Sequence, residues 1–209
     1  MKTNKLLFFS ALFLFSGFLL FMILVSINLF NSTDLLVTKE LQKIIPRALD
    51  VPFSLFSLIG SLEIVSFILF ILWAKYKKLK YFYVLISFGL FHLAEILGKI
   101  FVNHPNPPFE FFRYSIPFSF PTAQVNTGSS FPSGHMGRTV FLSSLFIFMI
   151  YNSKAFSKLQ KKLLYCLIAA ISILMFVSRI YLGEHWFSDV VGGGILGASL
   201  GILSLGFLF

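Results

Sequence analysis

Long apolar runs constrain this chain more than any other feature of its sequence. Each run is about long enough to cross a bilayer, because roughly 20 apolar helical residues span the hydrocarbon core. In lipid every backbone polar group must be bonded internally, so such runs are expected to be helices. The sequence therefore predicts an all-α integral membrane protein, a six-transmembrane-helix bundle forming one membrane-embedded domain over residues 1–209. The expected spans are approximately 6–30, 53–74, 81–101, 135–151, 163–178 and 188–208.

Composition excludes a soluble globular domain. Hydrophobic residues make up 57% of the chain, and Phe alone occurs 29 times. The first apolar run is too long for a signal peptide and lacks a small-residue cleavage site, so we expect a retained first span. A lone cysteine, Cys166, allows no intrachain disulfide.

Two stretches between the spans are longer than tight turns. Residues 32–50 are mixed in charge and carry leucines and isoleucines at near-helical spacing, which predicts a short amphipathic helix on the membrane surface. Residues 102–133 are rich in Pro, Asn, Ser, Thr and Gly, and irregular backbone of this kind cannot lie in hydrocarbon. We therefore expect a long outer loop between the third and fourth spans, and loops of this length are usually functional.

The lysines predict an orientation. The net charge of +9 does not indicate a nucleic-acid partner, because ten of the thirteen lysines gather on one side of the predicted bundle without any acidic residue. They are Lys2, Lys5, Lys75, Lys77, Lys78, Lys80, Lys154, Lys158, Lys161 and Lys162. By the positive-inside rule this side and both termini are cytoplasmic. Small size and short connections favour a bacterial plasma membrane, with the long loop and residues 178–189 on the outer face.

Residues 178–189, SRIYLGEHWFSD, carry a concentration of polar groups at the edge of a predicted span. Such residues are costly near hydrocarbon and usually mark a functional site. His185 and Asp189 are four apart and share one helix face. A carboxylate that accepts from one ring nitrogen fixes the tautomer of a histidine and leaves the other nitrogen free as a nucleophile. Arg179 supplies a planar fork of donors suited to phosphate, although arginines also commonly snorkel at membrane interfaces.

The predicted topology brings further groups to the same outer face. They are Lys99, Ser133, Gly134, His135, Arg138, Arg179, His185 and Asp189. Cations, two histidines and a helix start predict a site for an anion with covalent or acid–base chemistry. Two histidines and an aspartate are also possible metal ligands, but the neighbouring cations disfavour a metal. A proton or ion pathway is disfavoured because the groups lie on one face.

These residues resemble the phosphatidic acid phosphatase type 2 superfamily, metal-independent membrane phosphatases of lipid phosphates. The P-S-G-H motif is intact as Pro132 to His135. The S-R motif, followed by five residues, H, three residues and D, is intact from Ser178 to Asp189. The motif of K, six residues and R-P matches at Lys99 and Pro107 but holds Asn106 in place of arginine.

The resemblance implies a role for each matched residue. His185 attacks phosphorus and forms a phosphohistidine, and Asp189 orients it. His135 protonates the leaving oxygen and then activates water. Lys99, Ser133, Gly134 and Arg179 hold the phosphoryl oxygens. No cofactor and no metal are implied.

The exchange at Asn106 removes one phosphate cation, since Asn donates hydrogen bonds without charge. We hypothesise that Arg113 or Arg138 replaces it. His104 is a further candidate, although a loop histidine is more often solvated. Glu95 and Lys99 form an i, i+4 pair that positions Lys99 or is simply a buried pair.

The predicted function is hydrolysis of a lipid phosphate or diphosphate, such as undecaprenyl diphosphate, phosphatidylglycerophosphate or phosphatidic acid. The partners are therefore a membrane lipid and the bilayer, and the sequence does not define an oligomeric state. Two alternatives remain open: a lipid phosphotransferase, and a non-catalytic lipid-binding or transport protein.

Near the C-terminus, Gly193, Gly197 and Gly201 form a ridge of small residues that permits close helix packing.

Overall fold

The computed structural model describes residues 2–77, 79–120 and 128–208, and its regular structure there is helical, without any strand. Lys78 of the predicted lysine cluster and residues 121–127 of the predicted outer loop lie outside the described residues, as do the two terminal residues. The α-helices are α1 (Lys2–Ser26), α2 (Asn31–Ile44), α3 (Asp50–Ser57), α4 (Leu62–Tyr76), α5 (Leu79–Phe101), α6 (Gly134–Asn152), α7 (Lys158–Tyr181) and α8 (Phe187–Leu205).

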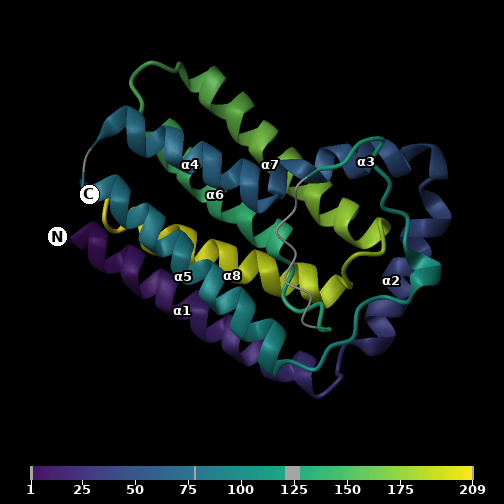
Figure 1. Cartoon of the computed structure of the whole chain (residues 1–209). Helices are drawn as coiled ribbons and strands as arrows, with labels where there is room; N and C mark the ends of the chain where they lie inside the picture. Colours follow the sequence, from purple (N-terminus) through teal and green to yellow (C-terminus); the bar gives the residue numbers. More distant parts are fainter. Residues whose placement is uncertain (1, 78, 121–127, 209) are drawn as a thin grey trace.

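Helix α8 lies at the centre of the bundle, where it packs against α1, α5, α6 and α7 (Figure 1). Its glycines make the closest of these approaches possible. A Cβ atom on Gly193 would overlap the carbonyl oxygen of Ser133, and one on Gly197 would overlap that of Gly137. The predicted ridge of small residues on this helix is therefore confirmed as the surface on which α6 packs.

In the described part of the chain, four helices are long and apolar enough to cross a membrane: α1, from Asn4, α5, α7 and α8. A fifth candidate is a bent pair, Arg47–Gly60 followed by Leu62–Tyr76, with an angle of 41°. The predicted span over 53–74 falls within this bent pair, where Ser61 interrupts the helix and its hydroxyl caps α4 by accepting from the N–H of Ile64. Helix α6 is long enough, with 19 residues, but it is not apolar enough to be counted with these helices. Its first turns carry glycines, His135 and Arg138.

The predicted amphipathic helix is present as α2 and packs on α7 and α8. The helix before it, α1, ends at Ser26 instead of continuing to residue 30. The backbone reverses just beyond that point, where Asn28 has a positive φ of 62°. This turn brings α2 back against α7 and α8.

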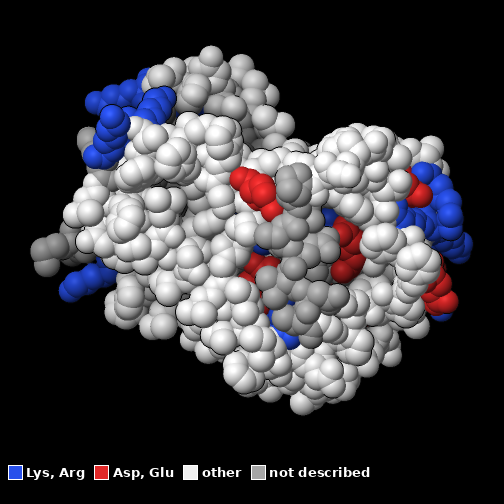
Figure 2. All heavy atoms as spheres, viewed as in Figure 1, with Lys and Arg blue, Asp and Glu red and all other residues white. Residues whose placement is uncertain are grey.

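Both chain termini lie at one end of the bundle, together with the α4–α5 and α6–α7 connections (Figure 1). The ammonium of Lys80 donates to the carbonyl oxygen of Leu208 at 2.9 Å, which joins the start of α5 to the C-terminal end. Basic side chains cluster at this end in Figure 2. Helices α2 and α3 lie at the opposite end, where Figure 2 shows basic and acidic side chains together.

Candidate active site

A pocket of about 560 Å³ opens between α5, α6 and the α7–α8 connection. Acidic and basic side chains gather in the hollow of the face drawn in Figure 2. Most of the residues predicted for the site line this pocket, although they come from segments far apart in the chain. They are Lys99, Asn106, Gly134, His135, Arg138, Arg179 and His185.

The start of α6 forms one wall of the pocket. Ser133 precedes the helix, and its N–H donates to the carbonyl oxygen of Asp189 at 2.9 Å, which fixes the turn against α8. A side chain at Gly134 would overlap the carboxylate of Glu95, so this position requires glycine. Unpaired N–H groups at a helix start favour a bound anion, and this one faces the pocket.

His185 lies in the connection between α7 and α8. Gly183 allows the tight turn before it with a φ of 68°. The His185 Nδ1 atom is 3.6 Å from Oδ2 of Asp189, a charge contact longer than a normal hydrogen bond. Burial lowers the pKa of His185, and the cations of Arg179 and Lys99 lower it further, although Asp189 opposes this. The imidazole is therefore uncharged at neutral pH, as a nucleophile must be.

Glu95 gathers three basic side chains at the floor of the pocket. Its carboxylate lies 3.2 Å from the ammonium of Lys99, 3.1 Å from Nη1 of Arg138 and 3.2 Å from Nδ1 of His92. The predicted pairing of Glu95 with Lys99 is confirmed. Because the carboxylate is buried, with 6% of the residue exposed, it holds these three side chains in fixed positions.

Arg179 is almost fully buried and forms an ion pair with Glu184 at 2.5 Å. Within the described residues, its Nε and Nη1 atoms have no hydrogen-bond partner, and neither does the hydroxyl of Ser133. Buried donors without partners are costly. Their presence beside the pocket is consistent with an anion-binding site.

The structure separates the two arginines proposed to replace the missing family arginine. Arg113 does not line the pocket, so its position lends no support to the prediction that it binds phosphate. Its guanidinium donates to the carbonyl oxygen of Gln42 at 3.1 Å and lies over the ring of Tyr181. Arg138 does line the pocket, where its Nε also donates to the carbonyl oxygen of Gly60 at 2.8 Å.

His104 is buried, with 3% exposed, and the expectation of a solvated loop histidine is wrong. It lies between Asp189, 2.9 Å from Nδ1, and Asp34, 3.5 Å from Nε2. It therefore does not replace the missing arginine at the pocket. Nothing near Asp34 in the chain indicates a site, so its place beside His104 was not predicted. Glu184 was not predicted either, although it immediately precedes His185.

The residues around the pocket favour an anion over a metal ion. Among the described residues, no group of three or more His, Cys, Asp and Glu side chains has a metal-binding arrangement. Lys99, Arg138 and Arg179 instead surround the two histidines with positive charge. Fold and site together define a class: helical membrane proteins with a cationic, histidine-containing pocket suited to an anion.

Comparison with known families places the chain within that class. The chain belongs to the PAP2 superfamily, whose family model matches residues 77–209. The matched region contains all three motifs and every residue that lines the pocket except Leu62.

Individual relatives agree with this assignment. Phosphatidylglycerophosphatase B of Bacillus subtilis (strain 168) is 29% identical over 123 residues, which are 59% of this chain and 55% of that protein. The chain thus spans little more than half the length of this curated relative.

Two solved structures share the fold. The crystal structure of a transmembrane PAP2 type phosphatidylglycerolphosphate phosphatase from Bacillus subtilis has a TM-score of 0.75 at 24% identity, with 94% of each chain covered. Aquifex aeolicus LpxE has a TM-score of 0.61 at 23% identity, covering 83% of this chain and 94% of its own.

Proposed function

We propose that the protein is a membrane phosphatase that hydrolyses a lipid phosphate or lipid diphosphate through a phosphohistidine on His185. The single observation that carries this proposal is the convergence on one pocket of His185, His135, Lys99 and Arg179 from separate elements. Binding alone would need no nucleophile, whereas His185 lies beside the buried carboxylate of Asp189.

In the first step the free Nε2 atom of His185 attacks phosphorus. The bond from phosphorus to the leaving oxygen breaks, and His135 donates a proton to that oxygen. The bound phosphate brings negative charge close to His135, which favours the protonated form of this histidine. Lys99, Arg179 and the N–H of Gly134 stabilise the charge on the phosphoryl oxygens. Asn106 donates a hydrogen bond there without adding charge.

In the second step water releases the phosphate. His135, now neutral, accepts a proton from water as the water oxygen attacks the phosphohistidine. The bond between phosphorus and Nε2 breaks and restores His185. Asp189 supports the positive charge that the imidazole carries while it is phosphorylated. A phosphotransferase would use the same residues with a second lipid in place of water.

We also propose a membrane arrangement for the whole chain, as one domain over residues 1–209. Helix α6 completes a six-span bundle with the four apolar helices and the bent pair, because its polar residues Arg138 and Thr139 are buried inside the protein. Six spans place both termini on one side, and the lysine clusters make that side cytoplasmic. The pocket then opens at the outer face of a bacterial plasma membrane, where a lipid headgroup can reach it.

The test is phosphate release by the purified protein in detergent micelles with EDTA present. Phosphatidylglycerophosphate, phosphatidic acid and undecaprenyl diphosphate form the substrate panel. We expect release from at least one lipid, and loss of about a thousandfold or more in His185→Ala. Lys43→Ala, an exposed change on α2, is the matched control. Product analysis separates free phosphate from a phosphorylated acceptor lipid, which would identify a transferase. Absence of release from folded protein would contradict the proposal.

A further inference from the structure

A row of four ionisable side chains extends from α2 to the proposed nucleophile. Asp34 lies 3.5 Å from Nε2 of His104, and Nδ1 of His104 lies 2.9 Å from Oδ1 of Asp189. The other oxygen of Asp189 lies 3.6 Å from Nδ1 of His185. Asp34, His104 and Asp189 are 2%, 3% and 0% exposed. His104 and Asp34 lie outside the pocket, so they can act on the reaction only through Asp189.

Both carboxylates in this row are fixed by further hydrogen bonds. Asp34 accepts from the N–H of Ser188 at 2.7 Å and from its hydroxyl at 2.8 Å. Oδ2 of Asp189 accepts from the N–H of Trp186 at 2.8 Å. Asp34 therefore joins α2 to the first turn of α8, the turn that carries Asp189.

His104 can donate to both carboxylates only when both of its ring nitrogens are protonated. Burial alone would lower the pKa of His104, but the hydrogen bonds and charges of Asp189 and Asp34 raise it to about 9. The hydroxyl of Ser130, 3.3 Å from Nδ1, is a neutral neighbour. His104 is thus an imidazolium at neutral pH, held between two carboxylates.

We propose that His104 and Asp34 are positioning residues for the reaction at His185. This inference rests on the proposed function, in which His185 is the nucleophile. His104 holds Asp189 through Oδ1, so that Oδ2 stays directed toward His185. The positive charge of His104 also offsets part of the charge of Asp189.

His104 and Asp34 have opposite electrostatic effects on the Asp189–His185 pair. A fully negative Asp189 would favour protonation of His185 and so block its attack on phosphorus, and the positive charge of His104 limits this effect. Asp34 prevents complete neutralisation, so the row keeps a net negative charge that stabilises the phosphorylated imidazole. On its other sides His185 faces the cations of Arg179 and Lys99, which disfavour a positive charge on its imidazole.

The first test is His104→Gln, which keeps a donor for Asp189 but removes the charge. We expect kcat to fall by up to about a hundredfold, as for other small displacements of reacting groups. The acidic limb of the pH profile should move by about half a unit or more toward higher pH, because Asp189 then favours protonated His185 more strongly. His104→Arg, which restores a cation, should return the limb toward its original position.

The control for this test is Ser199→Ala, which removes a buried hydrogen bond from α8 to the carbonyl oxygen of Ala11 at 2.9 Å, away from the pocket. It should lower stability without moving the pH profile. If His104→Gln has the pH profile of the unchanged protein, whatever its rate, then His104 is merely structural and the inference is wrong.

A second measurement does not depend on activity: the pH dependence of thermal unfolding. The pKa of about 9 in the folded protein exceeds the ordinary histidine value of about 6.5. The stability that His104 contributes is therefore complete below about pH 6.5 and is lost as the pH rises through about 9. The Tm difference between the unchanged protein and His104→Gln should shrink between pH 6 and pH 10. A Tm difference that stays constant over this pH range would contradict the claim that His104 is charged between Asp34 and Asp189.

These two measurements distinguish failure of the inference from failure of the proposed function. If the protein releases no phosphate but shows the shrinking Tm difference, the charged His104 between two carboxylates is supported and the proposed function is contradicted.

Asp34→Asn gives a further check, since its effect on kcat should be non-additive with that of His104→Gln. Asp50→Asn is its matched control, because Asp50 bonds the hydroxyl of Tyr181 and does not contact the row. Additive effects would contradict coupling through His104.

Discussion

At the residue scale, the cations of the pocket are already paired with carboxylates. Arg179 contacts Glu184, while Lys99 and Arg138 contact Glu95. Glu95 is buried beneath the start of α6, but Glu184 lies in the pocket wall with a partly exposed side chain. A phosphate that binds Arg179 must therefore compete with Glu184, whose charge also repels it.

Glu184→Gln should strengthen binding of phosphate-like anions. The change removes a negative charge while keeping a similar shape. We expect inorganic phosphate or vanadate to inhibit phosphate release about threefold to tenfold more strongly, which corresponds to roughly 0.7–1.4 kcal/mol. Glu110→Gln, an exposed acid in the segment after α5, is the control. Unchanged or weaker inhibition would show that Glu184 does not compete for the anion.

Arg138→Ala should mainly lower activity, whereas Arg113→Ala should mainly lower stability. Arg138 lines the pocket and bonds Glu95, so its removal should lower kcat/KM by roughly tenfold to a hundredfold. Arg113 binds backbone carbonyls and the ring of Tyr181, so its loss should lower Tm and leave kcat/KM within about twofold. Equal losses of kcat/KM in two folded variants would contradict this assignment.

The sequence predicted the motif residues because their spacing in the chain is itself diagnostic. Lys99, His135 and His185 match motifs, and the structure brings them to one pocket. His104 and Asp34 could not be predicted in this way. Their role depends on a contact between α2, the segment after α5 and α8, and no local pattern encodes it.

At the scale of helices, the contact between α6 and α8 determines where the site lies. The Ser133 N–H bonds to Asp189, and glycines of α8 lie directly against the backbone of α6. Any separation of these helices would also move His135 away from His185.

Gly193→Ala should therefore damage both stability and activity. The added methyl group would overlap the carbonyl oxygen of Ser133, and overpacking of this kind typically costs about 1–3 kcal/mol. Gly194→Ala is a matched control on the same helix, since its Cβ atom would meet Met136 only at 3.7 Å. Tm and phosphate release should fall in the first variant and remain near their original values in the second. Similar Tm values for both would contradict the close packing.

Helices were easier to predict than their interruptions. Apolar runs identified most of them, but the break between α3 and α4 falls within a run that is apolar on both sides. Its cause is long-range. The carbonyl oxygen of Gly60 accepts from Arg138, and a Cβ atom on Gly60 would lie 2.8 Å from the carbonyl oxygen of His135. Tertiary contacts with α6 therefore determine the bend.

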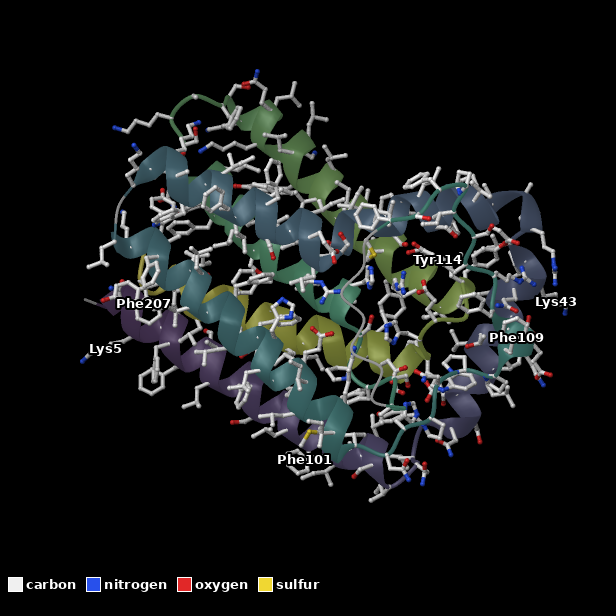
Figure 3. All side chains as sticks on the ribbon, in the orientation of Figure 1. Lys5, Lys43, Phe101, Phe109, Tyr114 and Phe207 are labelled. Atoms are coloured by element: carbon white, nitrogen blue, oxygen red, sulfur yellow. The ribbon has the colours of Figure 1, made fainter. Side chains whose placement is uncertain are left out.

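At the scale of the whole molecule, the termini lie at one end of the bundle and the pocket lies toward the other (Figures 1 and 3). Side chains labelled in Figure 3 mark the two ends: Lys5 and Phe207 lie at the end with the termini, and Lys43 and Phe109 at the other. Tyr114, which lines the pocket, lies between them toward the end with α2 and α3. The proposed membrane orientation assigns the first end to the cytoplasm.

Cysteine labelling tests this orientation. In a Cys166→Ser background, Lys43→Cys on α2 and Lys158→Cys at the start of α7 place single thiols at exposed positions on opposite sides. A membrane-impermeant maleimide should label Lys43→Cys in intact cells, and Lys158→Cys only after permeabilisation. The reverse pattern would place the pocket on the cytoplasmic side.

Direct detection of the phosphorylated enzyme tests the central claim. A lipid substrate with radiolabelled phosphate would be mixed with the protein in EDTA and quenched in alkali within the first turnover, since phosphohistidine is lost in acid. The account predicts a labelled peptide that contains His185, and no label in His185→Ala. Label on another residue, or unchanged phosphate release by His185→Ala, would contradict it.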